Sequence, residues 1–135
     1  MSLIRRFRDF RWAGAEERPY KDVPGSHLGV VRFALDGDGQ AGFQARYFEV
    51  QPGGYTSFER HEHEHCVVVL RGRARLRLGS EWHEIGDHDV VNIGPSTPHQ
   101  FRCLGEEPFG MLCIVDKVRD RPELLDTEES PEASD

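Results

Sequence analysis

The chain has 135 residues, a formal net charge of -7 and 37% hydrophobic residues. This size predicts one domain with a single core. From residue 119 to residue 135 there are seven acidic and two basic residues, a balance of -5, so residues 1–118 carry only -2. A nearly neutral domain argues against nucleic acid as a partner. No apolar stretch approaches the roughly 18 residues that a membrane span needs, so we expect no membrane contact.

The first residues of the chain and its cysteines indicate the cellular compartment of the protein. The first residues turn to arginine at Arg5 without the apolar stretch of a secretory signal. Cys66, Cys103 and Cys113 are odd in number and lie in apolar surroundings, which is typical of reduced thiols. These features predict a cytoplasmic protein. The acidic residues 119–135 have the composition of a disordered, solvated tail.

Residues 1–25 are predicted to form an arm that packs on the domain. Leu3, Ile4, Phe7 and Phe10 would lie on one side of a short helix, whereas Phe10 and Trp12 suit a strand equally well. Both alternatives stay open at this point.

Short apolar–polar alternations with turn residues between them follow along the chain. They predict strands at Val30–Leu35, Phe43–Val50, Thr56–His61, His65–Leu70, Arg73–Leu78, Glu81–Ile85, Val90–Ile93, Pro98–Leu104 and Phe109–Val115. We expect Pro52-Gly53-Gly54 to close the second of these strands, and the arginines of Arg73–Leu78 to point outward. Strands at such regular spacing indicate an all-β sandwich or barrel.

One predicted strand differs from the others. Cys66-Val67-Val68-Val69-Leu70 is apolar on both faces, and such a strand is covered on both sides. One face would line the interior of a barrel. The other needs a second sheet layer or a partner subunit, so we expect a homodimer.

The stretch His61-Glu62-His63-Glu64-His65 places three of the seven histidines at alternate positions. In an extended strand, alternate side chains point to one face. Three imidazoles on one face have a clear use if they share a metal ion. Glu62 and Glu64 would then point away, into solvent.

Two longer patterns contain this stretch and a further histidine. The first runs from Pro52-Gly53-Gly54 through the histidines and the apolar strand to Gly72. The second runs from Gly86-Asp87 through Gly94-Pro95 to His99. Together they resemble the two motifs of the cupin superfamily, over about residues 43–115. The resemblance implies a double-stranded β-helix, or jelly-roll barrel.

The resemblance also implies a ligand set. Counting along the family's pattern assigns Glu59, His61, His65 and His99 as metal ligands, with a glutamate in a position where the family usually has histidine. The alternative is that Glu59 orients a histidine and His63 takes the vacant position. The family's asparagine four residues after the last histidine is replaced by Cys103.

Oxygen and nitrogen donors of this kind suit iron, manganese, nickel or zinc. The resemblance implies a mononuclear metal-dependent enzyme that acts on a small organic molecule, either dioxygenase-like or a Lewis-acid isomerase or decarboxylase. Two alternatives remain: a metal-dependent binding or sensing protein without turnover, and a barrel that works through protein contacts.

Overall fold

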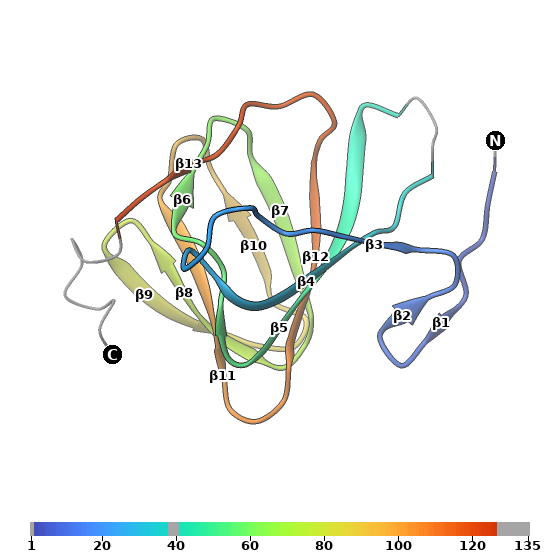
Figure 1. Cartoon of the computed structure of the whole chain (residues 1–135), viewed down its shortest axis with the longest axis horizontal. Coiled ribbons are helices and arrows are strands. Elements are labelled where there is room, and N and C mark those ends of the chain that lie inside the picture. The colour runs from blue at the N-terminus through green and yellow to red at the C-terminus, as the bar shows by residue number, and fades with distance from the viewer. Residues whose placement is uncertain (1, 38–40, 127–135) are drawn as a thin grey trace.

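The computed structural model describes residues 2–37 and 41–126. Every regular element in these two ranges is a β-strand (Figure 1). Neither range contains a helix long and apolar enough to cross a membrane. The strands are β1 (Phe7–Arg8), β2 (Arg11–Trp12), β3 (Glu16–Arg18), β4 (Leu28–Ala34), β5 (Phe43–Tyr55), β6 (Glu59–Arg60), β7 (His65–Arg71), β8 (Arg73–Leu78), β9 (Glu81–Ile85), β10 (Val90–Ile93), β11 (His99–Leu104), β12 (Phe109–Asp116) and β13 (Glu123–Leu124).

β3 to β13 form one curled sheet in which all pairs are antiparallel, and β1 and β2 form a separate two-stranded sheet. One half has the order β3-β4-β5-β12-β7-β10, and the other has the order β13-β6-β11-β8-β9. The pairing of Tyr55 in β5 with Arg102 in β11 joins the two halves. The predicted all-β jelly-roll fold is therefore confirmed.

The core fills the space between the two halves. It includes Val67 and Val69 of β7, Leu76 of β8, Phe101 of β11 and Phe109 of β12, all at most 3% exposed. Burying a side chain of this size contributes about 1.5–3 kcal/mol. The inward face of the apolar strand predicted at Cys66–Leu70 therefore lies in the core. Its outward residues are only half-buried.

The glycine pair does not end a strand, contrary to the prediction. β5 continues through Pro52-Gly53-Gly54 to Tyr55. Gly53 adopts a φ of 81°, which favours glycine, and a Cβ on Gly54 would collide with the carbonyl oxygen of Leu28 in β4. The glycines thus allow β5 to bend and remain close to its neighbour.

Two further strand predictions need correction. The strand expected at Thr56–His61 is regular only at Glu59–Arg60. In β8, Arg77 does not point into solvent: it is 6% exposed, and its guanidinium lies 3.8 Å from the centre of the Phe58 ring. A cation over an aromatic face is a stable arrangement for a buried arginine.

The N-terminal arm is a hairpin, so the helix alternative is wrong. β1 pairs with β2, and the rings of Phe7 and Trp12 lie 5.1 Å apart. Trp12 in turn packs on Tyr47 of β5 at 4.9 Å. In Figure 1 this hairpin lies at one side of the barrel.

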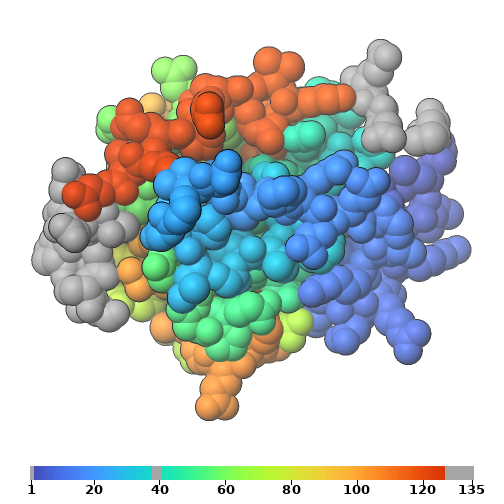
Figure 2. Space-filling view, viewed as in Figure 1, coloured from blue at the N-terminus to red at the C-terminus, as the bar shows by residue number. Residues whose placement is uncertain are grey.

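Part of the acidic tail packs on the barrel, which its composition did not predict. β13 pairs with β6, and the backbone N–H of Leu125 donates to the carbonyl of Phe58 at 2.8 Å. Figure 2 shows this C-terminal segment, in red, beside N-terminal residues in blue on one face of the molecule. Residues 127–135, for which we predicted disorder, lie outside the described ranges.

Candidate metal centre

Three histidines from separate segments meet inside the barrel. His65 begins β7, His99 begins β11, and His61 follows directly after β6. One ring nitrogen of each lies within 4.8 Å of those of the other two. His61 and His99 are only 4% and 3% exposed. The arrangement arises because β11 pairs with β6, which places His99 opposite Glu59.

Backbone carbonyls fix the tautomers of two of these rings. Nδ1 of His61 donates to the carbonyl of His63 at 2.7 Å, and Nδ1 of His99 donates to the carbonyl of Thr97 at 2.8 Å. Each ring therefore carries its proton on Nδ1 and keeps a lone pair on Nε2. The Nε2 atoms of His61 and His65 are buried and have no hydrogen-bond partner. Buried nitrogens of this kind fit a metal ion.

The surroundings keep these imidazoles neutral. Burial and the neighbouring His99 lower the pKa of His61 to about 4. Burial lowers the pKa of His99, and burial together with the other two histidines lowers the pKa of His65. Metal ligation needs the neutral form, so at neutral pH the group is ready to bind without releasing protons.

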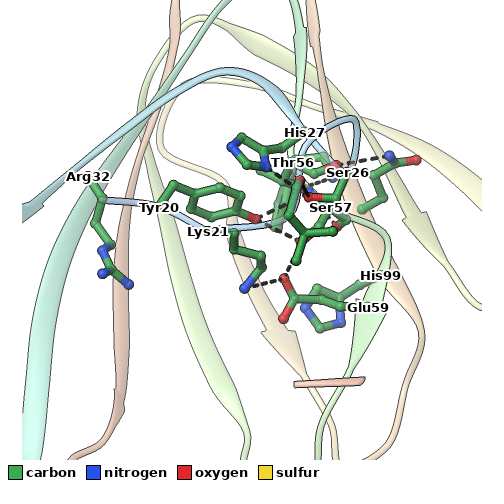
Figure 3. A network of polar contacts seen from close by, with 12 residues as sticks. Tyr20, Lys21, Ser26, His27, Arg32, Thr56, Ser57, Glu59 and His99 are labelled. Atoms are coloured by element: carbon green, nitrogen blue, oxygen red, sulfur yellow. Dashed lines mark hydrogen bonds and ion pairs between the residues drawn. The ribbon is translucent and has the colours of Figure 1, made fainter. Parts of the chain in front are cut away.

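Glu59 lies beside this group but is already engaged. Its carboxylate accepts a hydrogen bond from Ser57 at 2.7 Å and forms an ion pair with Lys21 at 3.3 Å (Figure 3). Burial opposes ionisation of Glu59, but Lys21 and the Ser57 hydrogen bond outweigh it and hold the pKa below its usual value. The three-histidine group does not include Glu59, and its role as a fourth ligand stays a prediction.

His63 packs against the three-histidine group and also lines the cavity. Its ring stacks on that of His61 with the centres 3.7 Å apart, and its Nδ1 donates to Asp120 at 2.7 Å. The same carboxylate accepts the backbone N–H groups of Glu62 and His63. These hydrogen bonds hold the pKa of Asp120 well below its usual value. As expected, Glu62 and Glu64 are exposed.

A cavity of about 140 Å³ opens beside the histidines. Phe101 lines it, whereas Cys103 does not. Four cationic residues that the sequence analysis did not select also line it, namely Lys21, Arg32, Arg46 and Arg119. One signal was available: Arg46 shares a strand face with the buried apolar residues Phe48 and Val50. Lys21 precedes β4 in a segment without periodicity, so no pattern marked it.

The comparisons with known proteins agree with this architecture. A family model described as the cupin domain matches residues 46–115. The chain belongs to the cupin family. It is similar to a solved cupin 2 conserved barrel domain protein from Rhodopseudomonas palustris, with 34% identity and a TM-score of 0.86. That similarity covers 98% of this chain and 97% of the other.

Two relatives of this cupin carry the names of enzymes. A 1-methylthio-D-xylulose 5-phosphate methylsulfurylase of Rhodospirillum rubrum is 39% identical over 117 residues, which cover 85% of this chain and 74% of the relative. An (S)-ureidoglycine aminohydrolase of Arabidopsis thaliana is 26% identical over 105 residues. This chain spans only 35% of that relative's length.

The neutral histidines predict how the stability of the metal-free cupin depends on pH. Each has a folded-state pKa below its unfolded value of about 6.5, so below that pH the unfolded state binds more protons than the folded state. The stabilisation is complete above pH 6.5 and declines below it, for His61 down to about pH 4. Each histidine contributes up to about 1.4 kcal/mol per pH unit. Urea unfolding at pH 7.5, 6.5 and 5.5 measures this, and a His65→Ala variant should show a shallower decline. Equal slopes for the two proteins would contradict the assignment.

Proposed function

We propose that this cupin is a mononuclear metal-dependent enzyme that acts on a small organic molecule. The observation that carries the proposal is the group of three neutral histidines, two with buried Nε2 atoms that lack partners; His65 and His99 of this group line a cavity. His61, His65 and His99 would hold the ion, and Glu59 would complete the set as the fourth ligand. Iron, manganese, nickel and zinc suit these donors.

A divalent ion here would supply Lewis-acid polarisation of a carbonyl or enolate, or activation of dioxygen. The protein's own residues favour the first chemistry. The Lys21 ammonium lies 3.3 Å from Glu59, inside the cavity and only 20% exposed. The Lys21 ammonium is therefore placed to donate a proton to a substrate.

Tyr20 anchors this arrangement. Its hydroxyl lies 3.0 Å from Ser57 Oγ and accepts the backbone N–H of Ser57 at 3.2 Å. Burial and the nearby Glu59 raise the pKa of Tyr20, so the phenol stays protonated at neutral pH. The chain Tyr20–Ser57–Glu59 fixes the carboxylate, which keeps Glu59 turned toward the cavity (Figure 3).

The relatives support an enzyme of small polar substrates. Their names denote activity on a sulfur-containing sugar phosphate and on ureidoglycine. The competing function is metal-dependent binding or sensing without turnover, which the same cavity would serve. Only an assay for turnover separates these two.

We expect the metal-loaded cupin to catalyse exchange of the acidic C–H protons of β-diketones and small keto acids in D₂O, followed by proton NMR, and we test catechols for oxygen uptake. His61→Ala should abolish the exchange because the metal is lost. Lys21→Met should reduce it about 100-fold or more while metal content, measured by mass spectrometry, is unchanged. Oxygen uptake without exchange would instead support dioxygenase-like chemistry. Tight ligand binding with neither signal would support the binding protein.

The fourth ligand can be tested by a matched pair of variants. We expect Glu59→Ala to weaken metal retention by about 10-fold or more, because a ligand is lost. His63→Ala should have a smaller effect, since the His63 ring packs on His61 and its Nδ1 donates to Asp120, and the variant keeps the backbone carbonyl that accepts from His61. Competition with a chromogenic chelator measures both affinities. The reverse order would assign the fourth position to His63.

We also propose that this cupin is a cytoplasmic homodimer. Its three cysteines are free thiols, which fits a reducing compartment. On the outward face of β7, Val68 pairs with Val90 and Leu112 and remains half-buried, beside an exposed Ile114. A second copy of the chain would cover this apolar face. Light scattering should give twice the mass of the chain, and Val68→Lys should give the mass of one chain. A monomeric wild-type protein would contradict the proposal.

A further inference from the structure

Three arginines line the cavity together with His65 and His99. Arg32 of β4 and Arg46 of β5 lie on the same face of the sheet, because Arg32 pairs with Phe48 and Arg46 pairs with Ala34. This face is the inner one, since Phe48 belongs to the core. Arg119 reaches the same cavity from the C-terminal segment. Two neighbouring strands and a returning segment thus bring three guanidinium groups to one place.

Each of these side chains is held in position by neutral groups. Arg32 donates to the carbonyl of Pro19 at 2.7 Å, and Arg46 lies over the ring of Phe48 at 4.9 Å. Arg119 donates to Oε1 of Gln44 at 2.8 Å and to the carbonyl of Asp116 at 2.8 Å. The guanidinium groups are therefore oriented but not neutralised.

No carboxylate within the described ranges forms an ion pair with any of the three arginines. The Nε atoms of Arg32 and Arg46 are buried and have no hydrogen-bond partner. The cavity lining contains one acidic residue, Glu59, which is engaged by Lys21. Burial and mutual repulsion lower the pKa of Arg32 and Arg119, yet a guanidinium stays charged at neutral pH. Partly buried cations without a counter-charge are costly unless an anion joins them.

We propose that Arg32, Arg46 and Arg119 bind the phosphate group of a substrate whose other end reaches His61, His65 and His99. A phosphate dianion offers three acceptor oxygens, and guanidinium groups bind them through paired N–H donors. This inference rests on the proposed enzymatic function and narrows its substrate to phosphorylated small molecules. In Figure 3 the side chains of Arg32, on β4, and Lys21, on the segment before β4, extend in the same direction, and both residues line the cavity.

The geometry gives the two ends of the substrate separate tasks. The arginines supply fixed charge that does not depend on the metal, and they would set orientation and affinity. The reacting end of the substrate would meet the histidines, Glu59 and Lys21. Further basic residues, Arg5, Arg18 and Lys117, line an adjoining hollow with the three arginines, and together they outnumber its two acidic residues, Asp36 and Glu16, the second of which pairs with Arg18. Their field would guide an anion toward the cavity.

Phosphate binding to the metal-free full-length protein tests this proposal. Calorimetric titration with inorganic phosphate at pH 7.5 should show saturable binding, and acetate should bind at least about 10-fold more weakly because it carries one charge. Arg32→Gln and Arg119→Gln should each weaken phosphate binding about 10-fold. Arg73→Gln is the matched control, because Arg73 is exposed in β8 and pairs with Glu84. It should change binding less than twofold.

Three results would overturn the phosphate site: no saturable phosphate binding by the wild-type protein, equal losses in Arg73→Gln and Arg32→Gln, or acetate binding as tight as phosphate. Circular dichroism verifies that each variant is folded, and Arg46→Lys, which keeps the charge, should retain more binding than Arg46→Gln. Metal content is measured on separate samples. Because the titration uses metal-free protein, a failed phosphate site and a failed metal site give different results.

Discussion

The convergence of three neutral imidazoles in a buried place is the constraint on which this structure depends. His61, His65 and His99 come from segments that only the folded sheet brings together. Without an ion, the buried Nε2 atoms of His61 and His65 leave hydrogen-bonding capacity unused, which costs free energy. A metal would convert this cost into a gain, so binding and folding are coupled. The backbone carbonyls that accept from Nδ1 prepare the rings for that role.

The electrostatics of the cavity follow from the same arrangement. The imidazoles add no charge at neutral pH, and Lys21 balances Glu59 at 3.3 Å. The three arginines therefore determine the sign of the potential that a ligand meets. The cavity lining contains one carboxylate, which Lys21 balances, and an excess of fixed positive charge. A molecule with distinct ends would enter it in one orientation.

The sequence predicted most of the sheet because period-two alternation was strong. β8, β9 and β10 have the predicted bounds. The errors have physical reasons. Gly53 and Gly54 were interpreted as a turn, but they serve a bend within β5 that needs positive φ and a close approach to Leu28. Arg77 was placed in solvent, because periodicity cannot show that an aromatic ring lies below it. Such contacts depend on residues distant in the chain.

The candidate site also contains residues that the sequence predicted and residues that it did not. The spacing of the histidines, with the resemblance to a family, selected three residues that the structure brings together. The cationic residues of the cavity were missed because lysine and arginine are usually surface residues, and only Arg46 shares a strand face with buried apolar residues. Asp120 was missed for a related reason: it lies in a segment whose acidic composition predicted disorder, yet its carboxylate accepts from His63.

The short strand β13 has a practical consequence for anyone who shortens this protein. A version that ends at residue 118 would lose Arg119, which lines the cavity. It would also lose Asp120, whose carboxylate accepts hydrogen bonds from the backbone N–H groups of residues 62 and 63. Such a trimmed polypeptide would fold around an altered pocket. Affinity tags are therefore better attached ahead of the β1–β2 hairpin, and deletion boundaries should lie beyond residue 126.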